Sequence, residues 1–272
     1  MSRLHYSESD SRLDTSVPHP ARVYGYWLGG KDHYAADRKA AGDVIRLRPQ
    51  VVASARANRA FGARVVHHLA ARCGIGQFLD IGTGLPAPDH THQVAQRANP
   101  RARVVYVDND PLVMAHARAL LTSTPPGACG YLDADLRDPG AIVAQAARTL
   151  DLTQPAAVLL LAVLHFLSDA EDPAAVVAAL AGGLAPGSYL AISHLTADLA
   201  PEQAGAAADA YNTLVPVPVI PRTHPQVTRL LGGLSLLAPG VVPVSEWRPE
   251  AGDVRQPCDL YGAVARIRRG RR

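Results

Sequence analysis

The chain has 272 residues, enough for one large domain, and hydrophobic residues make up 48% of it, which excludes a disordered chain. The formal net charge is +3, but residues 266–272 alone carry five arginines, so the excess of positive charge lies in this tail. The sequence of the rest of the chain does not predict the basic face of a nucleic-acid-binding protein. The three cysteines are far apart, which disfavours a disulfide framework, and no apolar run is long enough to span a membrane.

The beginning of the chain has no strand pattern. Residues 1–18 are polar and lack periodicity, so we expect them to form a flexible N-terminus. Apolar residues then recur at helical spacing in three segments, which are residues 20–28, 33–48 and 51–72. Three helices before any strand predict an N-terminal helical cap over residues 19–74.

From residue 75 onward, short apolar runs alternate with helical segments. The expected strands are Gln77–Ile81, Arg103–Val107, Cys129–Asp133, Ala156–Val163 and Ser188–Ser193. The expected helices between them are His90–Ala98, Pro111–Leu121, 139–150 and Pro173–Leu184. After two further helices, β segments at 240–247 and 260–267 are expected to form an antiparallel edge hairpin. The pattern predicts an α/β fold with a doubly wound, mostly parallel seven-stranded sheet over residues 75–268.

The loop after the first expected strand carries Gly82 and Gly84 on either side of Thr83. Glycines let the backbone turn sharply and approach a ligand, and their spacing also fits the fingerprint of NAD-binding proteins. Asp80 argues against NAD because its charge would repel a pyrophosphate, and Pro86 delays the helix whose N-terminus would receive phosphate. A ligand with an ammonium and a sulfonium group suits this acidic strand end, and S-adenosylmethionine carries both charges.

Acidic residues also follow the second and third expected strands. Asp108 is expected to accept hydrogen bonds from the ribose hydroxyls of the cofactor, with Asn109 beside the adenine. Asp135 is expected to accept from the adenine amino group, while Leu136 packs on the ring. Each acid could be an ordinary turn residue, but acids at the ends of three consecutive strands favour a cofactor site.

Several motifs resemble the Rossmann-like class I methyltransferases. They are Leu79-Asp-Ile-Gly-Thr-Gly84, Tyr106-Val-Asp-Asn-Asp-Pro111 and Asp133-Ala-Asp-Leu-Arg-Asp138. Together with Ala21-Arg-Val-Tyr-Gly-Tyr-Trp-Leu-Gly-Gly-Lys-Asp32 and Ala57-Asn-Arg-Ala-Phe61, they resemble an actinobacterial S-adenosyl methyltransferase family that was formerly a domain of unknown function. The similarity runs from about residue 18 to 267, and it implies the fold and the cofactor but not the substrate.

The resemblance also implies a ligand-facing role for Gly29 and Lys31 in the cap, as part of a lid over the cofactor. The chemistry of these residues equally allows a helix end followed by a new helix start. The chain departs from the family pattern at Gly25 and Trp27, where Asp and Leu are expected, and at Pro86, which replaces a third glycine of the class motif.

Two histidines follow strands near the expected position of the donor methyl. His165 comes after the buried fourth strand, near the expected cofactor contact Ala162, and its imidazole could remove a proton from an acceptor hydroxyl. A backbone-bonded structural histidine is the alternative. His194 closes the fifth strand and could face the substrate. His90 and His92 lack a third ligand at a sensible spacing, so no metal is expected.

The leading hypothesis is an S-adenosylmethionine-dependent methyltransferase that acts on a small molecule, because a helical cap without a basic groove favours a closed pocket. One alternative is an S-adenosylmethionine-binding protein with a regulatory or non-methylating role. An NAD-linked oxidoreductase is disfavoured by Asp80 and Pro86. We expect a cytoplasmic protein without a nucleic-acid or membrane partner, and the sequence leaves a homodimer open.

Overall fold

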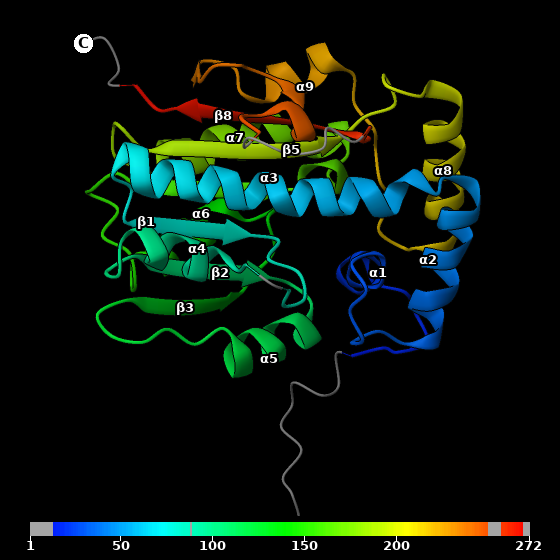
Figure 1. The fold of residues 1–272 in the computed structure, drawn as a ribbon, viewed down its shortest axis with the longest axis horizontal. Coiled ribbons are helices and arrows are strands. Elements are labelled where there is room, and N and C mark those ends of the chain that lie inside the picture. The colour runs from blue at the N-terminus through cyan, green and yellow to red at the C-terminus, as the bar shows by residue number, and fades with distance from the viewer. Residues whose placement is uncertain (1–12, 88, 250–256, 269–272) are drawn as a thin grey trace, which may run out of the picture.

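The computed structural model describes residues 13–87, 89–249 and 257–268. Most of the predicted flexible N-terminus, and the last four residues of the arginine-rich tail, therefore lie outside the described residues. Figure 1 shows a central sheet with helices on both faces and a further helical layer at one end. No helix in the described ranges is long and apolar enough to cross a membrane.

In the described part of the chain, three helices precede the first strand, as predicted. They are α1 (Pro20–Trp27), α2 (Ala35–Leu47) and α3 (Gln50–Cys73). α1 starts with a proline, which fits a first helical turn, and His19 precedes it in an extended conformation as the N-cap residue. α3 ends at Gly74, whose φ of 71° is a left-handed conformation that glycine adopts without strain.

Five parallel strands form the centre of the sheet. They are β1 (Gln77–Ile81), β2 (Arg103–Asp108), β3 (Ala128–Asp133), β4 (Ala157–Leu161) and β5 (Tyr189–Leu195). Their order across the sheet is β3-β2-β1-β4-β5, so the strand order changes direction between β1 and β4. This change leaves a crevice at the carboxyl ends of the strands, where doubly wound sheets bind their ligands.

The sheet differs from the prediction at its antiparallel edge. Across the described residues it has eight strands rather than seven, because two short strands replace one. β6 (Ser235–Leu236) and β7 (Val242–Pro243) both pair with β8 (Leu260–Arg266), which itself pairs with β5. Pro239, between the short strands, has no N–H for the ladder, and Gly240 has a φ of 91°. The predicted edge hairpin is therefore wrong in detail, since β8 lies inside the sheet and its partner strand is interrupted.

Helices cover both faces of the sheet (Figure 1). They are α3, α4 (Thr91–Ala98), α5 (Pro111–Leu120), α6 (Pro139–Ala146), α7 (Pro173–Gly182) and α9 (His224–Leu230). One apolar cluster includes Phe61 of α3 and Phe78 of β1, and the other includes Leu160 of β4 and Leu180 of α7. β4 contributes to both clusters, as its continuous apolar sequence predicts for a central strand.

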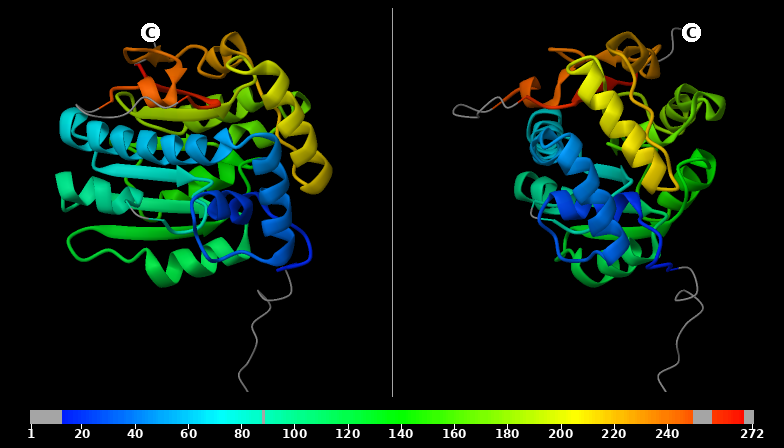
Figure 2. Two further views of the ribbon diagram at one scale, coloured as in Figure 1. Left: turned by 45° about the vertical axis from the view of Figure 1, so that its right-hand side comes forward. Right: turned by 90° about the vertical axis from the view of Figure 1, so that its right-hand side faces the viewer.

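The carboxyl ends of the parallel strands are covered by α1, α2 and α8 (Pro201–Leu214) (Figures 1 and 2). α8 follows β5 in sequence but packs against α2. Ala207 and Tyr211 of α8 join Val23 of α1 in a third apolar cluster. The covering layer thus combines α1 and α2 of the predicted cap with a helix from the second half of the chain, which the sequence pattern did not assign to it. The third helix of the predicted cap, α3, instead lies along a face of the sheet, where Phe61 packs in the same cluster as Phe78.

Candidate active site

A cavity of about 260 Å³ lies at the carboxyl ends of β1 to β4, beneath α1, α2 and α8. Its lining includes most of the residues predicted for the site. They are Asp80, Gly82, Thr83, Gly84, Asp108, Asn109, Asp135, Leu136, Ala162 and His165. Gly29, Lys31 and His194 are not among its lining residues. The sheet therefore brings residues of four loops, far apart in sequence, to one place.

The loop after β1 turns sharply at Gly82 and Gly84, whose φ values are 73° and 67°. The N–H groups of Gly82 and Thr83 both donate to the Val107 carbonyl, at 2.8 and 3.1 Å, so the loop folds over the end of β2. A Cβ at Gly82 would lie 2.8 Å from the Val163 side chain, whereas at Gly84 it would meet nothing within 4 Å. Gly82 is thus required for packing, and Gly84 leaves open space at the cavity wall.

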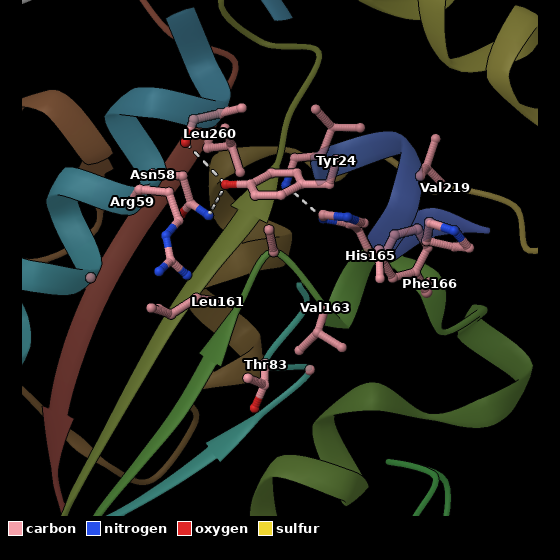
Figure 3. A pocket seen from close by; sticks show the side chains of 18 of the residues that line it. Tyr24, Asn58, Arg59, Thr83, Leu161, Val163, His165, Phe166, Val219 and Leu260 are labelled. Atoms are coloured by element: carbon pink, nitrogen blue, oxygen red, sulfur yellow. Dashed lines mark hydrogen bonds between the residues drawn. The ribbon is translucent and has the colours of Figure 1, made fainter. Parts of the chain in front are cut away.

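The Asp80 carboxylate, near the end of β1, accepts a hydrogen bond of 2.6 Å from the Thr91 hydroxyl. Burial raises the pKa of Asp80, and the Thr91 hydrogen bond and the positive charge of Arg59 oppose this rise. Arg59 belongs to α3, and Figure 3 shows its side chain at the cavity with Leu161 and Asn58. Among the described residues its guanidinium has no hydrogen-bond or ion-pair partner. An unpaired cation beside a carboxylate marks a place for a charged ligand.

The Asp108 side chain, at the end of β2, is only 6% exposed. One carboxylate oxygen accepts from the Gly84 N–H at 2.9 Å and the other from the Asp110 N–H at 3.0 Å. Burial raises the pKa of Asp108, and these two hydrogen bonds lower it. Because a carboxylate has about four lone-pair positions, about two remain for a ligand.

The loop after β3 combines polar groups with a buried leucine. Asn109 donates from Nδ2 to Asp135 at 3.1 Å, and Asp135 forms an ion pair of 3.3 Å with Arg137. Arg137 also pairs with Glu171. Leu136 is buried beside them and lines the cavity. This loop therefore presents an apolar surface with hydrogen-bonding groups at its border.

β4 is followed by a strained backbone turn. Ala162 has a φ of 56°, a conformation that costs about 1–2 kcal/mol for a residue with a Cβ. Its N–H donates to the carbonyl and the hydroxyl of Ser193, at 3.1 and 2.8 Å, and these bonds hold the turn in place. The turn brings Val163 and His165 to the cavity (Figure 3).

His165 is buried, and its Nδ1 accepts a hydrogen bond from the Leu195 N–H at 3.3 Å. Since a backbone N–H can only donate, Nδ1 carries no proton in the neutral ring, and the proton is on Nε2. Burial, with the nearby His194 and Arg222, holds the pKa of His165 well below its usual value. The neutral ring is therefore a hydrogen-bond donor at Nε2, which does not agree with the predicted general base.

His194 is fully buried behind His165. Its Nδ1 donates to the Leu195 carbonyl at 2.7 Å, and its Nε2 accepts from Arg222 at 3.0 Å. Burial lowers the pKa of His194 to about 4, so this ring is also neutral. The predicted substrate-facing role does not agree with this geometry, because both ring nitrogens are bonded within the protein.

Gly29 and Lys31 are exposed on the outside of the cap. Gly29 has a φ of 82° and follows the end of α1, where its N–H donates to the Tyr26 carbonyl at 2.9 Å. This is the helix-end alternative, and the ligand-facing role that the family resemblance implied for both residues does not agree with their positions.

The cap also supplies cavity residues that are not among the predicted site residues. The Tyr24 hydroxyl donates its one proton to the Ala55 carbonyl at 3.0 Å, so it accepts from Asn58 at 3.0 Å (Figure 3). Arg59 lies on the same side of α3, at helical spacing from Ala55 and Ala63. A charged residue on an otherwise small, apolar helix face was the signal in the sequence that could have identified it.

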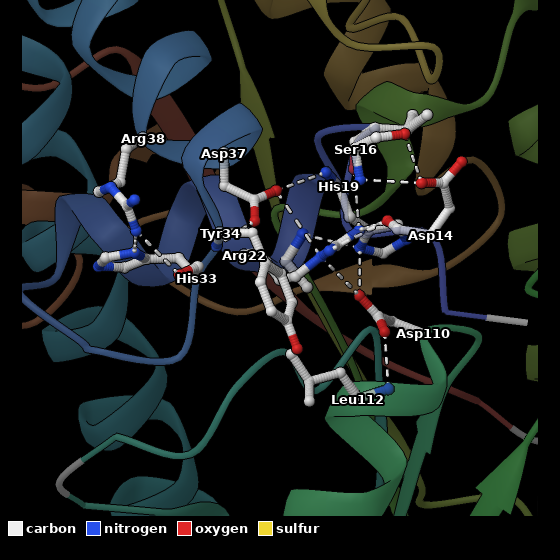
Figure 4. A network of polar contacts seen from close by, with 12 residues as sticks. Asp14, Ser16, His19, Arg22, His33, Tyr34, Asp37, Arg38, Asp110 and Leu112 are labelled. Atoms are coloured by element: carbon white, nitrogen blue, oxygen red, sulfur yellow. Dashed lines mark hydrogen bonds and ion pairs between the residues drawn. The ribbon is translucent and has the colours of Figure 1, made fainter. Parts of the chain in front are cut away.

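A buried ion cluster ties the cap to the loop after β2 (Figure 4). Arg22 Nε lies 3.7 Å from Asp37 and 3.4 Å from Asp110, and both of these carboxylates are buried. His19 Nδ1 lies 2.8 Å from Asp110, and the His19 N–H donates to Asp37 at 2.9 Å. Because the Asp110 N–H also donates to Asp108, the cluster links the position of α1 to that of the Asp108 carboxylate.

His90 and His92 stack on each other, and His92 Nδ1 lies 2.7 Å from the Tyr106 hydroxyl. In the part of the chain that the structure covers, no group of three or more His, Cys, Asp or Glu side chains is placed to hold a metal ion.

The strand order, the antiparallel β8 and the glycine loop with its acidic neighbours define the fold of a class I methyltransferase. Solved structures of low sequence identity share this fold. Human N-acetylserotonin methyltransferase in complex with SAM is 12% identical, with a TM-score of 0.51 over 96% of this chain and 65% of that chain. An O-methyltransferase family protein from Burkholderia thailandensis is 16% identical, with a TM-score of 0.53 over 97% of this chain and 69% of that chain.

Closer matches show the family. The family model described as S-adenosyl methyltransferase matches residues 6–268. A duf574 family protein from Streptomyces avermitilis is 43% identical, with a TM-score of 0.90 over 94% of this chain and all of that chain. A Thermobifida fusca protein named as a candidate methyltransferase is 38% identical, with a TM-score of 0.86 over 94% of this chain and 97% of that chain. Among curated proteins, none matches this chain.

The chain belongs to the S-adenosyl methyltransferase family and is an S-adenosylmethionine-dependent methyltransferase. The resemblance that the sequence motifs indicated is thereby confirmed.

Proposed function

We propose that this enzyme binds S-adenosylmethionine across the glycine loop and methylates a small molecule. The observation that carries this proposal is the pair of opposite charges at the cavity wall. The Asp80 carboxylate suits the α-ammonium of the methionine part. The Arg59 guanidinium, which has no partner among the described residues, suits its α-carboxylate. When bound, the cofactor supplies an electrophilic methyl group on a positively charged sulfur.

The other end of the cofactor fits the loops after β2 and β3. Asp108 keeps acceptor capacity for both ribose hydroxyls, and Gly84 leaves space for their close approach. Leu136 offers an apolar surface to the adenine, with Asn109 beside it. A pyrophosphate fits this place poorly, because α4 begins only at Thr91 and its N–H groups are remote from the glycine turn in sequence.

His165 acts in this proposal as a positioning residue. Its Nε2–H can donate to an oxygen of the acceptor, and its low pKa and its occupied Nδ1 prevent it from taking up a second proton near neutral pH. Because methyl transfer is an in-line displacement, orientation of the acceptor supplies much of the rate acceleration.

Isothermal titration calorimetry tests the cofactor site, with S-adenosylhomocysteine, S-adenosylmethionine and NAD as separate ligands. Arg59→Gln removes a charge-assisted hydrogen bond of about 1.5–3 kcal/mol, so S-adenosylhomocysteine should bind about tenfold to a hundredfold more weakly. Asp108→Ala should weaken binding by at least about tenfold for the same reason. Arg56→Gln, on the exposed side of α3, is the matched control and should bind as the wild type does. The proposal would be contradicted if NAD bound more tightly than either sulfur ligand. It would also be contradicted if the two arginine variants bound S-adenosylhomocysteine with equal affinity.

A further inference from the structure

The cavity extends from the strand ends into the space between the cap helices. We call this part the cap chamber and define it by Trp27, Val44, Ala207, Ala208, Tyr211 and Val219. These residues come from α1, α2, α8 and the segment after α8, and the chamber is therefore built apart from the loops that fit the cofactor. They also belong to, or pack against, the apolar cluster of the cap.

Among the described residues, the cap chamber has no unpaired charge for a ligand. Arg48 and Asp259 line the cavity, but they pair with each other through two contacts of 2.7 and 3.1 Å. The Asp259 N–H in turn donates to Ser54 at 3.0 Å. Arg59, Asp80 and the acids after β2 and β3 belong to the cofactor part of the cavity. Because an unpaired ion loses its hydration in an apolar space, the chamber disfavours a charged occupant.

Tyr211 supplies an unused polar group in the chamber. Its side chain lines the cavity and is 4% exposed, and its hydroxyl has no hydrogen-bond partner among the described residues. Burial raises the pKa of Tyr211, so the hydroxyl keeps its proton and can donate. Buried phenol hydroxyls usually find a partner, and one that faces a cavity without a partner points to a ligand with a hydrogen-bond acceptor.

The chamber reaches the place where methyl transfer is proposed. Phe166 and Leu195 pack against the cap cluster, and both lie next to His165. The ring centroids of Phe166 and His165 are 4.5 Å apart, and the Leu195 N–H donates to His165 Nδ1. Figure 3 shows Phe166 and Val219 beside His165. A molecule in the chamber would therefore lie next to His165, where the chamber joins the part of the cavity proposed for the cofactor.

We infer that the cap chamber binds the methyl acceptor, and that the acceptor is an uncharged, mainly apolar small molecule with a carbonyl or similar oxygen that accepts from Tyr211. This inference rests on the proposed function, because it places the acceptor beside a cofactor in the same cavity.

The test uses the full chain with saturating S-adenosylhomocysteine, so that the cofactor part is filled. N-phenyl-1-naphthylamine, a neutral apolar dye, reports on the chamber by fluorescence, and unlabelled naphthalenes compete with it. The wild type should bind 2-acetylnaphthalene about fivefold more tightly than 2-ethylnaphthalene, which lacks the oxygen. Tyr211→Phe should abolish this preference without changing the affinity for S-adenosylhomocysteine.

Tyr26→Phe makes the same substitution on a cap tyrosine that packs on His33 outside the cavity, and it should keep the preference. Ala207→Leu should weaken both naphthalenes because it fills the chamber. Three outcomes would overturn this inference alone. The wild type could bind the two naphthalenes equally well, or it could bind 2-naphthoate more tightly than either. It could also bind S-adenosylhomocysteine but no naphthalene. Failure to bind S-adenosylhomocysteine would contradict the proposed function, and this inference with it.

Discussion

At the scale of single residues, three backbone conformations shape the cavity at the strand ends. Gly82, Gly84 and Ala162 all have positive φ, and all line the cavity. Glycine adopts this conformation freely, so the loop after β1 is unstrained, whereas Ala162 depends on its bonds to Ser193. A Cβ at Gly82 would meet the Val163 side chain, whereas a Cβ at Gly84 would meet nothing within 4 Å. Gly82 is therefore required for packing, and Gly84 leaves open space at the cavity wall.

Gly82→Ala should lower the free energy of unfolding more than Gly84→Ala does. Both variants force an alanine into the left-handed region, at about 1–2 kcal/mol, but only the first also meets Val163, which adds about 1–3 kcal/mol. Urea unfolding of the protein without ligand measures the difference. Gly84→Ala should instead weaken S-adenosylhomocysteine binding, because its methyl group points into open space at the cavity wall. Equal stability of the two variants would show that Val163 moves aside.

At the scale of elements, one arginine joins three segments that meet beneath the cap. Arg222, 3% exposed, donates to the Leu164 and Leu167 carbonyls after β4 and to His194 at the end of β5. It also pairs with Asp169 at 2.7 Å. The Arg222 N–H donates to the Leu195 carbonyl, so the segment before α9 is fixed to the same strand end. These bonds hold the His165 turn without contact with a ligand.

Arg222→Met should lower the free energy of unfolding by about 2–4 kcal/mol, because buried carbonyls and the His194 ring lose their donor. The matched control is Arg229→Met on the exposed side of α9, which should change stability little. Denaturant unfolding followed by circular dichroism gives both values. If the two variants unfold at the same urea concentration, the Arg222 bonds contribute no net stability.

At the scale of the whole molecule, the half-buried His90 and the buried His194 make stability depend on pH. Burial lowers the pKa of His90 and of His194 to about 4, from about 6.5 in an unfolded chain. Between these pH values the unfolded chain binds more protons than the folded one, so stability rises with pH there. The contribution of each ring is complete above about pH 6.5 and is lost as the pH falls toward about 4.

His194→Gln should reduce the slope of stability against pH near pH 5 by up to about 1.4 kcal/mol per pH unit, which is the effect of one proton. The glutamine oxygen can still accept from Arg222, so the bond to the arginine is kept. Urea unfolding at several pH values between 4 and 7 measures the slope. His67→Gln, at an exposed histidine, is the control and should leave it unchanged. The same slope in both variants would mean that His194 does not titrate differently on folding.

The sequence by itself determined the layout of strands and helices and the acidic residues that meet at the strand ends. Apolar runs of five to eight residues and helical spacing are local signals, and the five parallel strands fall within two residues of the predicted bounds. The meeting of Asp80, Asp108 and Asp135 at one cavity was predictable because parallel strands bring their carboxyl ends to one edge.

Only the tertiary structure decided what lies across from those strand ends. The placement of α8 on α2 depends on contacts between segments far apart in the chain. So does the finding that, within the described ranges, Arg59 and the Tyr211 hydroxyl have no partner. The same holds for His165 and His194, which are both histidines after apolar strands in sequence. Their difference comes from which backbone group each ring nitrogen meets, and hydrogen-bond partners of this kind leave no periodic signal in the sequence.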